Sequence, residues 1–158
     1  MAYLSAMSLT IGVWAQPVDQ AGLDFVIEAE RLGVDSVWVP EFWGYDALAP
    51  IAAAAAVTDR IRLASGIVQL GTRTPAMLAM TALSLQRISE GRFILGLGTS
   101  GPQVMEGWHG VPFSKPMTRT RETIEIIRMV MSGERLRYDG DVYQLPLADG
   151  QGRALRCA

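Results

Sequence analysis

The segment from Ile61 to Gly101 constrains the fold most strongly, because it contains the signals of a strand, a polar loop, a helix, a second strand and a glycine-rich loop. Its two strand-like runs, Ile61 to Ala64 and Phe93 to Leu97, are short and apolar, as in a parallel sheet covered on both faces. Each run ends in small or polar residues, where an α/β fold places its ligand sites. The segment therefore predicts a parallel βαβ unit whose chemistry follows the strands.

The same unit repeats along the chain. Strand-like runs begin near residues 9, 36, 61 and 93, at intervals of 25 to 32 residues. A βαβ unit takes roughly 30 residues, so each interval has room for one crossover helix. No linker or low-complexity tract interrupts residues 8–147. We therefore expect one α/β domain of four consecutive βα units.

Four helices are predicted, at Val18 to Leu32, Ala47 to Val57, Thr74 to Gly91 and Thr118 to Ser132. Thr74 is an expected N-cap, and Pro75 follows it at the first helical position. Helical spacing predicts the inward-facing residues: Leu23, Val26 and Ile27 in the first helix, Leu78, Ala82, Leu85 and Ile88 in the third, and Ile124, Ile127 and Met131 in the fourth. Helices thus alternate with parallel strands.

Composition excludes several classes of protein. The 158 residues are 49% hydrophobic and 19% charged, which is ordinary for a globular domain with one core. The net charge of −2 gives no basic footprint for nucleic acid. No apolar run approaches the roughly 18 residues of a membrane span, and the first ten residues lack signal-peptide features. Since Cys157 is the only cysteine, no disulfide or metal site is predicted, and we expect a cytoplasmic protein without nucleic-acid or membrane partners.

Two stretches lie outside the repeated units. The irregular segment from Thr99 to Met117 is rich in glycine and proline and follows the fourth strand, where functional loops usually lie. Arg137 to Gln144 is predicted to form a β-hairpin that turns at Gly140. Residues 148–158, ADGQGRALRCA, are predicted to be a truncated tail.

Three motifs accompany successive predicted strands, and they are GVDSVWVPEFWGYDA, LASGIVQLGTRTPAMLA and GRFILGLGTSGPQVMEGWHG. In this order they resemble the N-terminal half of the luciferase-like monooxygenase family, especially the members that use the deazaflavin coenzyme F420. The resemblance implies a (β/α)8 TIM barrel, of which residues 8–147 supply about four βα units, or half a barrel. It also implies a truncated or frameshifted product, or a deliberately cut piece of a longer protein.

The resemblance places a cofactor ring against the end of the third strand. It implies a bulge with a non-proline cis peptide at Gly66–Ile67, next to Ser65, that presses against the ring. Glu41 lies where relatives have an acidic residue that contacts the ring. Its neighbour Phe42 replaces a histidine and cannot transfer a proton, so no catalytic residue is assigned.

The other candidate residues follow the first, second and fourth strands. Gly98, Thr99 and Ser100 are expected to form a wall beside the cofactor, although glycines here also suit tight packing. The substrate pocket is expected to include Trp14, Trp43, Trp108 and His109. For His109 the alternative is a structural hydrogen bond. For Arg73 the two interpretations are an anion contact and an ion pair beside the third helix.

The predicted function is that of an oxidoreductase that exchanges a hydride between a flavin-type ring and a small organic substrate. Coenzyme F420 is favoured and FMN is the alternative cofactor. By the resemblance, Pro102 lies where sugar-phosphate dehydrogenases of the family carry a glutamate, and Met105 lies where several relatives have a ring-binding asparagine. This argues against glucose-6-phosphate. The protein is expected to be part of a longer enzyme and to form a homo-oligomer.

Two other interpretations remain open from the sequence. A half barrel exposes strand edges, so the chain could be a non-catalytic module that associates with itself or with a partner fragment. A complete flavodoxin-like domain is the third interpretation. It is disfavoured because VWAQPVD, after the first strand, contains no phosphate-binding loop.

Overall fold

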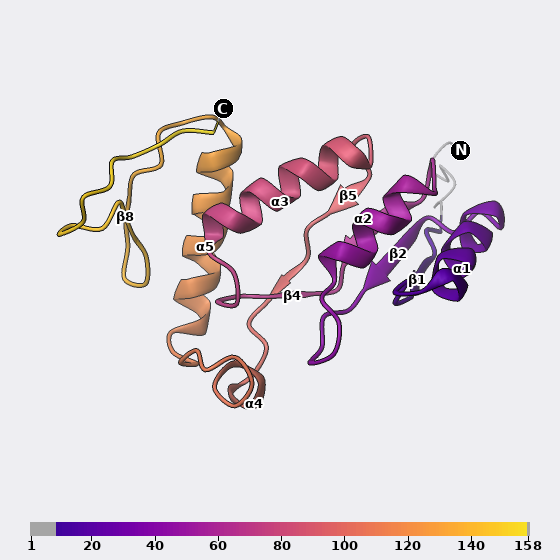
Figure 1. Cartoon of the computed structure of the whole chain (residues 1–158), viewed down its shortest axis with the longest axis horizontal. Coiled ribbons are helices and arrows are strands. Elements are labelled where there is room, and N and C mark those ends of the chain that lie inside the picture. The colour runs from indigo at the N-terminus through magenta and orange to yellow at the C-terminus, as the bar shows by residue number, and fades with distance from the viewer. Residues whose placement is uncertain (1–8, 158) are drawn as a thin grey trace, which may run out of the picture.

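A computed structural model describes residues 9–157 of the chain (Figure 1). Residue 8, the predicted start of the half barrel, and residue 158, the last of the predicted tail, lie outside the described residues. The strands are β1 (Gly12–Trp14), β2 (Ser36–Val39), β3 (Arg62–Ser65), β4 (Val68–Gln69), β5 (Phe93–Ile94), β6 (Leu97–Gly98), β7 (Tyr138–Asp139) and β8 (Gln144–Leu145). The helices are α1 (Gln20–Arg31), α2 (Leu48–Ala56), α3 (Pro75–Ile88), α4 (Pro102–Met105) and α5 (Pro116–Met131).

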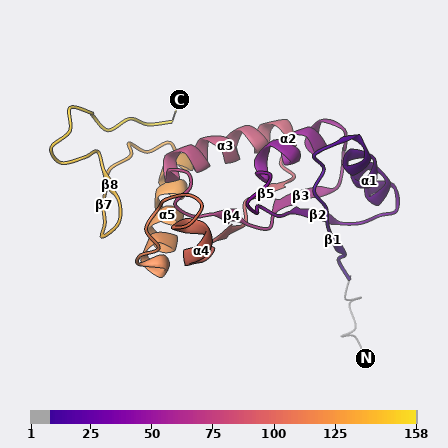
Figure 2. The same cartoon turned by 60° about the horizontal axis from the view of Figure 1, so that its bottom comes forward.

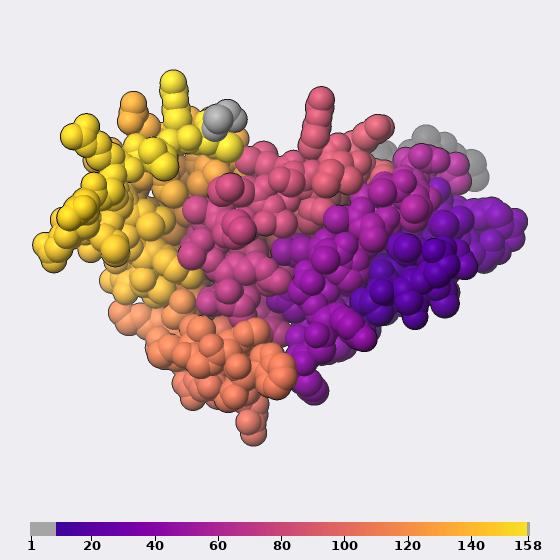
Figure 3. Space-filling model, viewed as in Figure 1, coloured from indigo at the N-terminus to yellow at the C-terminus, as the bar shows by residue number. Residues whose placement is uncertain are grey.

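The main sheet is parallel and its strands follow one another in chain order, β1-β2-β3-β5. This order contradicts the flavodoxin-like interpretation, because a doubly wound sheet reverses direction at a switch point. The space-filling view shows the same progression, since the colours follow the chain from indigo across the molecule to yellow (Figure 3).

The predicted fourth strand, Phe93 to Leu97, is divided into two short strands, which corrects the sequence interpretation. β5 pairs with β3, and β6 pairs with β4. Between them the Ser65 hydroxyl donates to the Gly96 carbonyl and accepts from the Gly96 amide, both at 2.9 Å. The Gly96 carbonyl also accepts the Val68 amide at 2.8 Å. The Ser65 side chain therefore replaces a backbone partner at the Gly96 amide, where the pairing passes from β3 to β4.

The helices α1, α2 and α3 lie along one side of the main sheet (Figure 2). The register aligns Val37, Leu63 and Phe93 in a buried row that belongs to the hydrophobic core. A second row, on the opposite face, runs through Trp14, Trp38, Ala64 and Ile94. In this second row Trp14 is 65% exposed, whereas Ala64 is buried. The inner face of the sheet is thus only partly covered.

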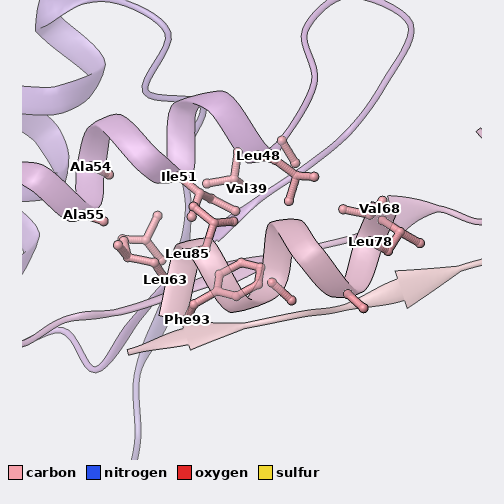
Figure 4. Packing of buried hydrophobic residues seen from close by; sticks show 14 of the residues in the cluster. Val39, Leu48, Ile51, Ala54, Ala55, Leu63, Val68, Leu78, Leu85 and Phe93 are labelled. Atoms are coloured by element: carbon pink, nitrogen blue, oxygen red, sulfur yellow. The ribbon is translucent and has the colours of Figure 1, made fainter. Parts of the chain in front are cut away.

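The core lies between the helices and the outer face of the sheet (Figure 4). Ile51 from α2, Leu78 and Leu85 from α3, and Leu63 and Phe93 from the strands are all buried. Leu78, Ala82 and Leu85 confirm the predicted inner face of the third helix. Among residues 9–157, no helix has both the length and the apolar character needed to cross a membrane.

Three residues predicted to face inward are exposed instead: Ile27, Ile88 and Met131. Ile27 follows Val26 directly, so it points about 100° away from the buried stripe formed by Val26 and Ala29. Ile88 and Met131 are the last residues of their helices, where no further turn packs against the sheet. Helix boundaries thus explain the exposure of Ile88 and Met131, whereas helical periodicity explains that of Ile27.

Polar side chains form hydrogen bonds with the backbone around the N-terminal ends of the strands. We call this end of the sheet the amino end. The Arg92 guanidinium donates to the carbonyls of Ser89, Ile61, Ala55 and Thr58 and to the Thr58 hydroxyl, at 2.8–3.1 Å. The Glu30 carboxylate accepts the amides of residues 59–61, with its shortest contact, 2.7 Å, to Arg60. Burial raises the pKa of Glu30, but these backbone hydrogen bonds outweigh it and hold the pKa below its ordinary value.

The hairpin of β7 and β8 is held in the same way. Glu122, which is buried in α5, accepts the amides of Asp141, Val142 and Tyr143 at 2.8–3.0 Å. The antiparallel pairing of β7 with β8 confirms the predicted hairpin. Helix α5 begins at Pro116, two residues before the predicted start, and the long loop that precedes it contains the short helix α4.

Candidate functional site

The C-terminal ends of β2, β4 and β6 lead into three loops that meet over the sheet, and we call this region the mouth. The loops comprise residues 40–47, 70–74 and 99–115. They enclose a hollow of about 290 Å³. Ten residues line it: Glu41, Phe42, Trp43, Gly44, Tyr45, Asp46, Thr72, Arg73, Trp108 and His109. Four of the predicted site residues, Glu41, Trp43, Trp108 and His109, therefore lie in one hollow.

Glu41 and Arg73 form a two-pronged ion pair across the floor of this hollow. Arg73 Nη1 lies 2.9 Å from Glu41 Oε1, and Nη2 lies 2.8 Å from Oε2. The carboxylate also accepts the amides of Gln69 at 3.1 Å and Ala47 at 3.3 Å. Because the Glu41 side chain is only 6% exposed, its charge is well shielded from water. The geometry supports the ion-pair interpretation of Arg73 and joins the loops after β2 and β4.

A second link joins these loops to the segment after α4. The Gln69 amide nitrogen donates to the Glu41 carbonyl at 3.1 Å. Its oxygen lies 3.1 Å from His109 Nε2. The structural hydrogen bond considered for His109 is thus present. Gln69 was not singled out from the sequence, because no local motif indicates contacts with residues 28 and 40 positions away.

Below the hollow, β3 bends into β4 beside the strand pair β5 and β6, and we call this region the neck. The peptide bond between Gly66 and Ile67 is cis, as the family resemblance implies. Ser65 is fully buried, and its hydroxyl binds Gly96 rather than facing the mouth. The neck therefore places the Gly66–Ile67 bond at the base of the mouth.

The glycines of the neck differ in the space around them. A Cβ at Gly96 would lie 2.1 Å from the Ser65 carbonyl oxygen, and a Cβ at Gly98 would lie 2.8 Å from Ile67 Cγ1. Both positions exclude a side chain, in agreement with the tight-packing interpretation. At Gly66 the nearest atom would be Trp38 Cε3 at 3.4 Å, an ordinary contact. Gly66 is therefore not the most crowded point of the neck.

Gly98, Thr99 and Ser100 leave the neck in an irregular conformation. Gly98 ends β6, and Ser100 has a positive φ of 57°. The Thr99 hydroxyl lies 3.3 Å from the Ser100 carbonyl. All three residues are half-buried beside the mouth. Their position suits a wall next to a ligand, and their contact with a cofactor stays a prediction.

Aromatic rings surround the mouth, and several of them are exposed to solvent. Trp14 stacks edge-on against Phe42, with ring centroids 6.3 Å apart, and Phe42 lies 6.0 Å from Trp43. Trp43 and Trp108 are 64% and 63% exposed. Trp14 does not line the hollow itself and reaches it only through Phe42. Exposed aromatic groups of this kind are typical of ligand or protein contact surfaces.

Comparison with known proteins gives one consistent result. A family model described as luciferase-like monooxygenase matches residues 7–155. A protein of Mycobacterium tuberculosis (strain ATCC 25618 / H37Rv), named "Putative coenzyme F420-dependent oxidoreductase Rv3520c", is 44% identical over 155 residues. That match covers 95% of this chain and 45% of the relative.

Two solved structures share the fold. One is the coenzyme F420 dependent tetrahydromethanopterin reductase from Methanopyrus kandleri, with a TM-score of 0.75, 26% identity, and coverage of 87% of this chain and 44% of that one. The other is the oxygenating constituent of 3,6-diketocamphane monooxygenase from Pseudomonas putida in complex with FMN, with a TM-score of 0.72, 25% identity, and coverage of 87% and 43%. The chain spans less than half the length of these relatives, which confirms the predicted half of a (β/α)8 barrel.

Proposed function

Because the chain belongs to the luciferase-like monooxygenase family, we propose that it forms the cofactor-binding half of an oxidoreductase that transfers a hydride between a flavin-type ring and a small organic substrate. Coenzyme F420 is the preferred cofactor, since the 44% identical relative is named for it, and FMN is the alternative. The bound ring would supply the redox chemistry, while the protein binds, orients and shields it.

The observation that carries this proposal is the combination of an open glycine and exposed indole rings at the mouth. Gly66 leaves its side-chain space empty between Trp38 and Trp14, within 3.4 and 3.9 Å. A flat aromatic ring system needs apolar surface on its face and close approach of the backbone, and this arrangement offers both. The residues present therefore fit a flavin-type ring.

Individual roles follow from position. Gly66 and Ile67 would contact the ring from below, and Gly98, Thr99 and Ser100 would present backbone amides beside it. Glu41 is committed to Arg73, so we propose that it supports the cofactor by fixing the loop after β2. Trp14, Trp43, Trp108 and His109 would shield the substrate side from water.

The division of the chain into residues 8–147 and a tail of residues 148–158 remains part of this proposal. So do a cytoplasmic location and assembly into a homo-oligomer. The partly covered sheet supports association, because Trp14 in the edge strand β1 and Ile11, which directly precedes this strand, are exposed. A non-catalytic half barrel that only pairs with another copy is the competing proposal, and sedimentation combined with the cofactor titration below separates the two.

The test is a titration of the 158-residue chain with F420 and with FMN, followed by an assay of substrate-dependent cofactor reduction. Catalysis in a barrel draws on strand ends from the whole ring, so we expect weak ring binding and no turnover by the chain alone. Turnover should appear when four further βα units are supplied, in the same chain or as a second fragment. Tight FMN binding with no affinity for F420 would reverse the cofactor preference.

A further inference from the structure

His109 is the single histidine of the chain, and one of its ring nitrogens faces a fixed partner in the mouth. Its side chain is exposed and lines the hollow, together with Trp43 and Trp108. Its Nε2 lies 3.1 Å from the Gln69 oxygen. The structure records no hydrogen bond to Nδ1 from any residue between 9 and 157.

The orientation of Gln69 decides which ring nitrogen of His109 carries the proton. Gln69 is 3% exposed, and its amide nitrogen lies 3.1 Å from the carbonyl oxygen of Glu41. A carbonyl oxygen accepts only, so the NH₂ group of Gln69 must point at Glu41 and its oxygen must point at His109. The side-chain oxygen of Gln69 can likewise only accept a hydrogen bond. Nε2 of His109 therefore donates, and in the neutral ring Nδ1 keeps its lone pair.

The charged side chains that line the hollow already have partners within the protein. Arg73, the cation that lines the hollow, is paired with Glu41 and lies 3.9 Å from Asp46 Oδ1. Asp46 itself accepts the amides of Leu48 and Ala49 at the start of α2. A phosphate or carboxylate would meet no unpaired cation here and would face the Asp46 carboxylate. The hollow is thus unsuited to an anion.

We propose that the hollow binds an uncharged aromatic molecule that carries a hydroxyl or N–H group, and that this group donates a hydrogen bond to Nδ1 of His109. The exposed rings of Trp43 and Trp108 give apolar walls, and the volume of about 290 Å³ lies at the lower limit for small-ligand sites. Gln69 is the positioning residue, because it holds the ring in the form that accepts at Nδ1. This substrate class rests on the proposed function, since it assigns the hollow to the substrate side of the mouth.

The protonation form can be measured directly, because the chain has a single histidine. Long-range ¹H–¹⁵N correlation spectra of the ¹⁵N-labelled chain, recorded where the ring is neutral, should show the Nε2–H form. In Gln69→Leu, which replaces the amide with an apolar side chain of similar size, both forms should appear. An Nδ1–H ring in the wild-type chain would overturn the proposal, and that result does not depend on how the variant folds.

Binding is tested with three probes that differ in one group: 2-naphthol, 2-methoxynaphthalene and 2-naphthyl phosphate. A single neutral hydrogen bond corresponds to a factor of about five in affinity, so 2-naphthol should bind about five-fold more tightly than the methyl ether. It should also shift the Nδ1 resonance, whereas the phosphate should bind more weakly than either probe. Equal affinities for naphthol and ether, or a preference for the phosphate, would overturn the proposal.

Two variants complete the test. His109→Phe keeps an exposed ring without nitrogen, so the preference for naphthol over the ether should disappear. Phe25→Ala, which removes an exposed ring from α1 outside the hollow, should keep the preference. A retained preference in His109→Phe would overturn the proposal. The outcome of the cofactor titration does not depend on these results. A wrong substrate class can therefore be distinguished from a wrong proposed function.

Discussion

The two ends of the parallel sheet use charged side chains in opposite ways. At the amino end, Arg92 and Glu30 bind backbone carbonyls and amides of the loops that precede β3 and β5. At the mouth, Arg73 and Glu41 bind each other, and exposed rings of Trp43 and Trp108 surround them. The charged side chains of the amino end therefore satisfy the hydrogen-bonding groups of the backbone there, while the mouth leaves surface available to a ligand.

This difference follows a general property of barrel folds. Loops at the C-terminal ends of the strands carry the active site, and the opposite end contributes to stability. In this chain the assignment can be made from hydrogen bonds alone. Substitutions at the amino end should lower the free energy of unfolding, whereas substitutions at the mouth should mainly change ligand binding. The following predictions test that separation, beginning with the largest expected effect on stability.

Arg92→Met should have the largest effect. The variant keeps the length of the side chain but leaves four carbonyl groups and one hydroxyl without their donor. We expect the free energy of unfolding to fall by about 2–4 kcal/mol, measured by urea denaturation. Arg31→Met is the matched control, because Arg31 pairs with Glu28 on the surface of α1 and its loss should change the stability little. Equal stability of the two variants would contradict the role assigned to the amino end.

Glu30→Gln should have a smaller effect that depends on pH. The amide keeps the size of the side chain but loses the charge that binds the amides of residues 59–61, so we expect a loss of about 1 kcal/mol at neutral pH. The folded-state pKa of Glu30 is lowered, so its contribution is complete above the ordinary glutamate pKa. The contribution disappears as the pH falls through the lowered value. Denaturation of both proteins from pH 7 to pH 3 should therefore show a shrinking difference, and a constant difference would refute this assignment.

Local sequence signals predicted the main elements because each element is encoded within a few residues. Thr74 and Pro75 define the start of α3, and the Thr74 hydroxyl does accept the amide of Met77. Apolar runs defined β2, β3 and β5, whose outward residues Val37, Leu63 and Phe93 form the core row. Chain order gave the half barrel, because four consecutive βα units leave few other arrangements.

The polar contacts could not be predicted in the same way. Arg92 binds groups 31 to 37 positions earlier, and Gln69 connects Glu41 with His109 across three loops. Neither residue has a neighbour in sequence that signals these contacts. The sequence did provide the candidates Glu41, Trp43, Trp108 and His109, which the fold brings to one hollow. It could not show that Glu41 is neutralised by Arg73, since this pairing exists only once the loops after β2 and β4 meet.

Arg73→Met tests whether the ion pair supports the mouth rather than the whole fold. The variant leaves the Glu41 carboxylate with two backbone amides as partners. Because the Arg73 side chain is 23% exposed and these amides remain, we expect a loss of about 1 kcal/mol in the free energy of unfolding, less than for a fully buried pair. The double variant Glu41→Met with Arg73→Met removes both charges and should be no less stable than Arg73→Met alone. A double-mutant cycle by denaturation measures this coupling. Strictly additive losses would show that the two side chains act independently.

Gly66→Val should have the smallest effect on folding and the clearest effect on the mouth. The first added carbon would meet Trp38 at an ordinary distance of 3.4 Å, so we expect the free energy of unfolding to change by less than about 1 kcal/mol. The branched side chain would, however, occupy the space beside Trp14 and Trp38 that we assign to the cofactor ring. Gly96→Ala is the contrasting variant, because its added carbon would lie 2.1 Å from the Ser65 carbonyl oxygen and should impair folding itself. Fluorescence titration with F420, paired with denaturation of the same samples, should find weaker cofactor binding in a stable Gly66→Val protein. Unchanged cofactor affinity there would remove the ring contact from Gly66 and leave the neck a purely structural junction.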